Sequence, residues 1–257
     1  MTAPGWIMLG WLVFAGAHLA LGLPPMRDHL ARRLGEPAFV AMFSGIAALT
    51  FGLLAVLVAV HGGQGPEGTG LREMPAARTA LAALAFAGLV LAMAGIVHYA
   101  RSPMALFRTH IRPPSGIERI TRHAFFVGIS VFAIAHALIA PTLAIAIYFG
   151  GFAALALVGM PLQDRKLLRK WGAPYAEYLA VTSAVPGLAL LQGRQSWAGG
   201  EGTGRTLAWA AGIAGLLLLA HPLWSTANGA TFAGLIAVGG LLASARRWLH
   251  SRKTREA

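Results

Sequence analysis

Two histidines of this chain lie in stretches that are otherwise almost wholly apolar. His18 lies in "FAGAHLALG" and His136 in "VFAIAHALIA". A polar ring at membrane depth is costly, so it either bonds a carbonyl or hydroxyl group of a neighbouring helix or serves as a ligand. No acid stands near either histidine, which disfavours zinc and di-iron centres. Two neutral imidazoles on facing helices suit the iron of haem b, so His18 and His136 are the candidate metal ligands.

A third histidine, His123, directly follows Arg122 at the start of "HAFFVGISVFAIAHAL". At 100° per residue, His136 points roughly 140° away from His123 around a shared helix, so the two should not belong to one site. Arginine favours phosphate and carboxylate groups. Arg122 and His123 are therefore either solvated at the membrane surface or part of a cofactor- or anion-binding site at headgroup level.

The composition is that of a membrane protein. Of the 257 residues, 56% are hydrophobic and only 12% are charged, against about 25% charged in soluble domains. About 20 apolar residues cross a bilayer as a helix, the conformation that satisfies its own backbone there. The fold class is therefore an all-α, polytopic transmembrane bundle of about seven spans. They are residues 4–23, 39–60, 76–97, 124–140, 142–162, 206–223 and the shorter 229–243.

The basic residues predict how the spans are oriented. The formal charge is +12, and the lysines and arginines gather in the first, third and fifth loops and in the C-terminal tail. Under the positive-inside rule this places the N-terminus outside and the C-terminus in the cytoplasm, as a multi-pass protein of a bacterial inner membrane. The positive charge then reflects topology and contact with anionic lipids, and nucleic acid is not an expected partner. The first span lacks a basic n-region, so we do not expect a cleaved signal peptide.

Cysteine is absent, which excludes disulfides, thiolate metal sites, iron–sulfur clusters and covalently attached haem.

The chain is expected to form a five-span core over residues 1–195 and a C-terminal two-helix hairpin with a basic tail over 196–257. Within the core, "DRKLLRKWGAPYAEYL" spaces apolar and aromatic residues at helical intervals among basic ones, which predicts an interfacial helix at about 164–181. Glu36 and Asp164 are interpreted as the only acids at membrane edges near basic loops, and each is expected to pair with an arginine.

Several blocks, in order, give the chain a resemblance to the NnrU family. They are "WLVFAGAHLALGLPPMRDHLARRLGEPAFVAMFS", "SGIERITRHAFFVGISVFAIAHAL", "FGGFAALALVGMPLQDRKLLRKWGAPYAEYLAVTSAVPGLALLQGR" and "LLLLAHPLW". The resemblance implies a link to nitric oxide and denitrification metabolism, as for bacterial members. It also implies redox-dependent isomerisation of a lipid-soluble polyene, as for the plant relative 15-cis-zeta-carotene isomerase, a haem b membrane enzyme with histidine ligands. Matching the blocks carries those ligands to His18 and His136.

One departure from the family pattern affects His123. The family usually reads Arg-His-Pro where this chain has Arg122, His123 and Ala124. Without that proline, the start of the following helix is expected to be looser.

Two other functions stay open. Arg122-His123, the stretch "LLRKWGAPYAEYL" and a later proline are similar to the cofactor-binding part of isoprenylcysteine carboxyl methyltransferases. That resemblance implies an S-adenosylmethionine site at the cytoplasmic interface with His123, Asp164, Tyr175 and Tyr178, although the usual paired glutamates are absent. The third possibility is a non-enzymatic membrane partner or transport accessory, which would bind neither haem nor another cofactor.

Overall fold

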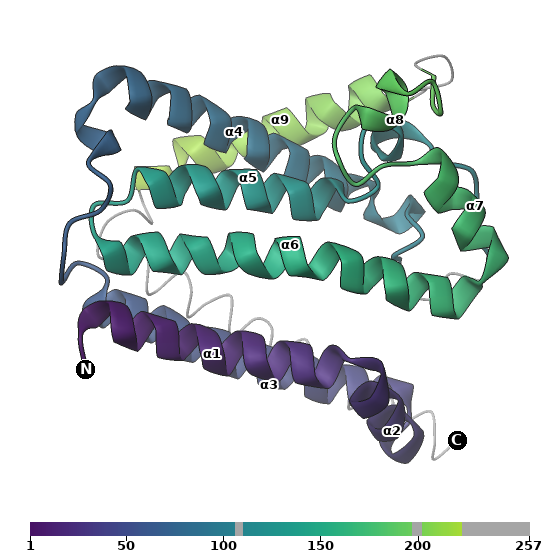
Figure 1. Ribbon diagram of the computed structural model, residues 1–257, viewed down its shortest axis with the longest axis horizontal. Helices are drawn as coiled ribbons and strands as arrows, with labels where there is room; N and C mark the ends of the chain where they lie inside the picture. Colours follow the sequence, from purple (N-terminus) through teal and green to yellow (C-terminus); the bar gives the residue numbers. More distant parts are fainter. Residues whose placement is uncertain (106–109, 197–201, 223–257) are drawn as a thin grey trace. The chain divides into compact units, whose positions relative to one another are not determined.

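The computed structural model describes residues 1–105, 110–196 and 202–222, and within these ranges every regular element is a helix (Figure 1). Four helical segments are long and apolar enough to cross a membrane: α1 (Ala3–Gly22), α3 (Glu36–His61), α4 with the short η2 (Pro75–Arg101) and α6 (Leu143–Trp171). Two shorter apolar helices are α5 (Ala124–Leu138) and α9 (Thr203–Leu219). The described part of the chain is therefore all-helical, and its long apolar helices are those of a multi-pass membrane protein.

Six of the seven predicted spans coincide with these helices. The seventh, 229–243, lies outside the described residues, and the orientation of the bundle stays a prediction. The first predicted loop is itself helical, forming α2 (Pro24–Leu34). The boundary placed at residue 195 also stays a prediction, although α9 packs against α4.

The predicted interfacial helix at 164–181 is wrong in its bounds. Its first part is the end of α6, and its second part is a separate helix, α7 (Ala173–Val181). Gly172, at φ 59°, separates them, in a left-handed conformation that glycine adopts without the steric cost of a Cβ. Whether α7 lies in the membrane interface stays a prediction.

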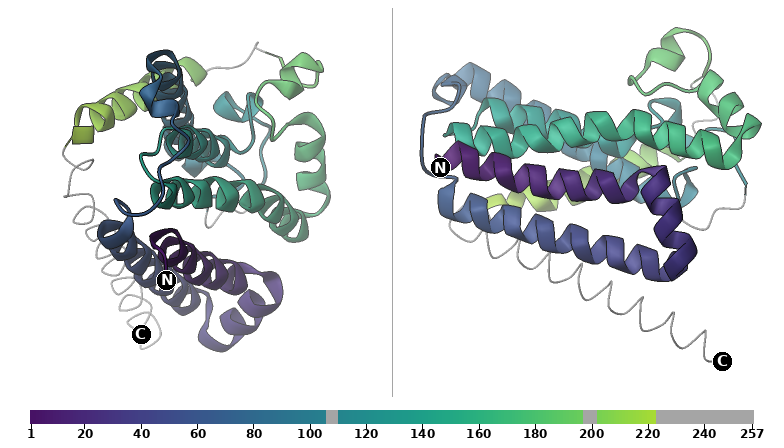
Figure 2. Two further views of the ribbon diagram at one scale, coloured as in Figure 1. Left: turned by 60° about the vertical axis from the view of Figure 1, so that its left-hand side comes forward. Right: turned by 60° about the horizontal axis from the view of Figure 1, so that its bottom comes forward.

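The chain forms two compact units. The first consists of Met1–Thr69, Ala140–Tyr148 and the chain from His221 onward, and the second of Gly70–Ile139 and Phe149–Ala220. In the first unit, α2 links α1 and α3, which run antiparallel (Figure 2). Along this pair, Phe14 faces Phe51 and His18 faces Phe43.

In the second unit, α4 and α5 approach each other through small residues. A Cβ added at Gly128 of α5 would lie 2.2 Å from the backbone nitrogen of Ala92, and one added at Gly88 of α4 would lie 2.6 Å from that of Phe132. Ala92 is fully buried. Small residues allow this approach in membrane bundles, where lipid supplies little hydrophobic drive and backbone packing does more of the work.

The helices α5 and α6 form an antiparallel hairpin. Along α5, Phe126 contacts Gly159 of α6 and His136 contacts Phe149, so the contacts run in opposite order along the two helices. Between the helices described so far lie η1 (Leu71–Glu73), η3 (Gly116–Arg119) and α8 (Leu188–Leu191).

Gly128→Ala should destabilise the α4–α5 contact. The new methyl group has no room beside Ala92, so the helices must move apart, at a cost of about 1–3 kcal/mol. Gly150→Ala, within α6, is the matched control because nothing lies within 4 Å of the added carbon. Thermal unfolding of the purified protein in detergent measures both variants. Equal melting temperatures for the two would contradict the close approach.

Candidate functional site

His18 lies in α1 among aromatic rings. Its ring centroid is 5.7 Å from that of Phe14 and 4.9 Å from that of Phe43 on α3. Its Nδ1 is buried and has no hydrogen-bond partner. The carbonyl or hydroxyl partner considered for this ring is therefore absent at that nitrogen within the described part of the chain.

His136 lies in a comparable aromatic setting on α5. Its ring centroid is 4.1 Å from that of Phe132 and 4.7 Å from that of Phe149 on α6. Nδ1 lies 2.9 Å from the carbonyl oxygen of Phe132. A carbonyl only accepts, so Nδ1 carries the hydrogen and Nε2 the lone pair, which is the tautomer of many ligating histidines.

The predicted pairing of His18 and His136 stays a prediction, since the two belong to different compact units. Across residues 1–105, 110–196 and 202–222, no group of three or more histidine, aspartate or glutamate side chains could hold a metal ion. A site with only two protein ligands is outside that criterion.

The second candidate site is built around the carboxylate of Asp164, late in α6. It accepts hydrogen bonds from Arg122 Nη2 at 2.8 Å, from His123 Nε2 at 2.9 Å and from the Tyr175 hydroxyl at 2.7 Å. The predicted pairing of Asp164 with an arginine is thus confirmed. So is that of Glu36, which pairs with Arg27.

Two side chains of this second site are buried, and those of Arg122 and Asp164 are partly buried. His123 is 0% exposed and Tyr175 1%, so the solvated alternative for His123 is wrong. Burial, and next the hydrogen bond to Asp164, raise the pKa of Tyr175 far above its ordinary value, so its hydroxyl stays a donor. With its hydrogen on Nε2, His123 has its lone pair on Nδ1, which is buried and has no hydrogen-bond partner.

The chain after α7 holds this site in place. The backbone carbonyl oxygen of Ser183 accepts a hydrogen bond from the backbone N–H of Arg122 at 2.9 Å. The carbonyl oxygen of Ala184 accepts one from the Thr121 hydroxyl at 2.7 Å. His123 is the residue before α5, and Ala124 is the first helical residue. The helix therefore begins where the family's proline would stand, and whether its start is looser stays a prediction.

One buried acid, Glu118, was not predicted from the sequence. Glu118, in η3, is 2% exposed, so Glu36 and Asp164 are not the only acids beside the basic loops. Its Oε2 accepts from the backbone N–H of Ser115 at 3.0 Å and lies 3.5 Å from both His98 Nε2 and Arg112 Nη2. Ser115 and Glu118 form a capping box. This Ser-x-x-Glu pattern was the available sequence signal.

The family model "NnrU protein" matches residues 6–246. The chain belongs to the NnrU family. This NnrU protein is also 28% identical over 190 residues to the 15-cis-zeta-carotene isomerase of Arabidopsis thaliana, a chloroplast protein. That alignment covers 72% of the chain and 50% of the relative, so the chain spans about half of the relative's length. No solved structure matches it significantly.

Asp164→Asn should destabilise this NnrU protein. The substitution leaves the partly buried guanidinium of Arg122 without its counter-charge, at a cost of about 1–3 kcal/mol. Tyr175→Phe removes one donor of three and should cost about 1 kcal/mol. Thermal unfolding in detergent measures both. Glu177→Gln, at an exposed acid on α7, is the control, and an Asp164→Asn protein as stable as this control would refute the role of the carboxylate.

Proposed function

We propose that this NnrU protein is a membrane-embedded isomerase of a lipid-soluble polyene, with haem b as its cofactor and His18 and His136 as the iron ligands. The observation that carries the proposal is the similarity to a zeta-carotene isomerase over 72% of the chain. A polyene dissolves in the bilayer, and the chain's many exposed large hydrophobic side chains are consistent with contact to lipid. Substrate would therefore arrive from the membrane.

The residues around both histidines fit haem b. His18 has a buried nitrogen without a partner, and the hydrogen bond at Nδ1 of His136 leaves Nε2 as its basic nitrogen. The rings of Phe14 and Phe43 flank the first histidine, and those of Phe132 and Phe149 flank the second. Such rings supply the apolar contact that a porphyrin requires. When bound, the iron would supply a Lewis-acidic, redox-active centre.

The protein's own contribution to this chemistry is binding, orientation and exclusion of water. Isomerisation changes the geometry of a double bond without net gain or loss of atoms, so it needs neither a hydrolytic water nor an acid–base pair. The backbone carbonyl oxygen of Phe132 accepts a hydrogen bond from Nδ1 of His136 and thereby fixes the tautomer and the direction of the imidazole ring. The phenylalanines beside each histidine keep polar solvent away from a conjugated ligand.

A second use of the same two histidines is the response to nitric oxide that the bacterial members of the family imply. A diatomic ligand would compete with one imidazole for the iron, so the protein would act in sensing or in denitrification metabolism. The same His18 and His136 would be needed, and only the substrate would differ.

The methyltransferase alternative gathers some support, because Arg122, His123, Asp164 and Tyr175 meet in one site. The carboxylate of Asp164, however, is already engaged by three side chains of the protein. Because these side chains already satisfy one another's hydrogen-bonding groups, a structural role is favoured over an open site for S-adenosylmethionine.

Haem binding is tested by the absorption spectrum of the purified, haem-replete protein. We expect a Soret band, and we expect His18→Ala and His136→Ala each to shift or remove it. His29→Ala, at an exposed histidine of α2, is the control and should leave the band unchanged. Absence of a Soret band in the wild type would refute the cofactor, and a band unchanged in both variants would refute the ligands.

Isomerase activity is tested in liposomes that contain 15-cis-zeta-carotene, with the isomers separated by chromatography. We expect conversion by the wild type under reducing conditions, and a rate at least about a hundredfold lower for His136→Ala, since loss of a metal ligand commonly costs this much. No conversion at all would refute the isomerase. If calorimetry instead detects S-adenosylmethionine binding that is lost in His123→Ala, the methyltransferase alternative is favoured.

A further inference from the structure

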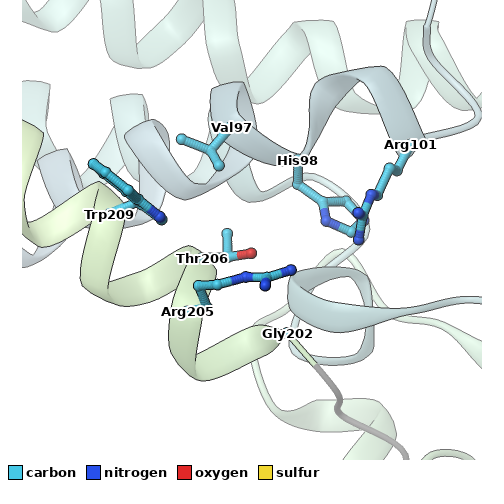
Figure 3. A pocket seen from close by; sticks show the side chains of 7 residues that line it. All are labelled: Val97, His98, Arg101, Gly202, Arg205, Thr206 and Trp209. Carbon is cyan, nitrogen blue, oxygen red and sulfur yellow. The ribbon is translucent and has the colours of Figure 1, made fainter.

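A cavity of about 130 Å³ lies in the second unit, between the end of α4 and the start of α9 (Figure 3). It is far larger than the roughly 10–15 Å³ that one water needs. Besides Gly202, its lining consists of two arginines, two other polar residues and two apolar ones: Arg101, Arg205, His98, Thr206, Val97 and Trp209.

Both arginines are exposed, whereas Arg122 and Arg112 are partly buried. Arg122 pairs with Asp164 and Arg112 with Glu118, whereas neither Arg101 nor Arg205 forms an ion pair with an acid of the described chain. Figure 3 shows both side chains extending toward the side of the cavity where His98 lies. Two uncompensated guanidiniums at one cavity favour an anion, phosphate above all.

The cavity has a cationic part, formed by Arg101 and Arg205, and an apolar part, formed by Val97 and Trp209. Val97 lies in the last turn of α4 and Arg101 ends the short η2 that follows it. Trp209 follows Arg205 by four residues in α9, so these two lie one turn apart on the same helix face. The chain runs toward the cavity along α4 and away from it along α9, which places both arginines toward the helix ends. Val97 is 41% exposed and Trp209 65%. Tryptophan beside basic residues is typical of a membrane–water interface.

Arg112 holds two of the residues that line the cavity, His98 and Arg101. His98 is 5% exposed, and its Nε2 lies 3.2 Å from Arg112 Nη2. Arg112 also donates from Nε to the carbonyl oxygen of Arg101 at 2.7 Å, which holds the backbone that carries this arginine. Glu118 lies beside Arg112 and His98, and among the described residues it forms no ion pair with Arg101 or Arg205.

The start of α9 adds to the positive potential. Gly202 precedes the helix without a side-chain cap, so N–H groups of the first turn face no side-chain acceptor there. The 17-residue helix also directs the positive end of its dipole toward this position.

We propose that this cavity binds a phosphate group, and that in the membrane this phosphate is the headgroup of an anionic phospholipid. Arg101 and Arg205 hold the phosphate oxygens, and the acyl chain lies along Val97 and Trp209. A free phosphate-bearing molecule would use the same arginines but not the apolar residues. The proposal is independent of haem and of the isomerase activity.

The test uses the full-length protein in neutral detergent, titrated with phosphatidylglycerol whose acyl chains carry bromine, which quenches nearby tryptophan. We expect saturable quenching that is largely lost in Trp209→Phe. Arg101→Gln and Arg205→Gln should each weaken the affinity about tenfold, as loss of a charge-assisted hydrogen bond does. Arg165→Gln, at an exposed arginine of α6, is matched in charge and should bind as the wild type.

Two further titrations distinguish the source of the phosphate. Brominated phosphatidylcholine should bind more weakly than phosphatidylglycerol, because its headgroup carries no net charge. Inorganic phosphate at millimolar concentration should not displace the lipid if the headgroup is the ligand, and displacement would assign the cavity to a free phosphate compound. Unchanged affinity for phosphatidylglycerol in Arg101→Gln and Arg205→Gln, or an equal loss in Arg165→Gln, would overturn the proposal.

Discussion

The carboxylate of Asp164 fixes one end of the second unit. A buried charge is costly unless several donors satisfy it, and here Arg122, His123 and Tyr175 do so together. These donors come from the residues before α5 and from α7, so one carboxylate of α6 joins three segments. The break at Gly172 is what allows α7 to leave the direction of α6 and present Tyr175 to Asp164. The start of α5, and with it the register of this helix against α4 and α6, depends on this interaction.

Away from Asp164, the helices of the second unit are held together by close backbone packing and not by charged groups. Gly88 and Gly128 allow α4 and α5 to approach until a methyl group no longer fits, which is the kind of contact that holds helices together where lipid offers no solvent to expel. The histidines His18 and His136 lie within such apolar surroundings, each beside two phenylalanine rings. An aromatic, water-poor environment is suited to a conjugated, lipid-soluble ligand and unsuited to hydrolysis. The polar networks are instead gathered near the helix ends, where headgroups and water are available.

The two proposals rest on different chemistry. The isomerase proposal depends on imidazoles in apolar surroundings and on similarity to a relative of which the alignment covers 50%. The lipid proposal depends on two arginines that pair with no acid of the described residues and on two apolar residues that line the same cavity. A bound anionic headgroup would compensate these two charges. It would also hold the start of α9 beside the end of α4, whatever reaction takes place deeper in the bundle.

The sequence by itself determined the helical, membrane-spanning class, because a long apolar segment in lipid can satisfy its backbone only as a helix. It also determined the family, the pairing of Asp164 with an arginine, and the apolar setting of His18 and His136. The capping box at Ser115 and Glu118 could also be read from the Ser-x-x-Glu pattern. Only the tertiary structure decided that His123 is buried, that Gly172 divides the predicted interfacial helix, and that Arg101 and Arg205 meet at one cavity. These depend on contacts between residues far apart in the chain, and hydropathy and spacing describe only neighbours along it.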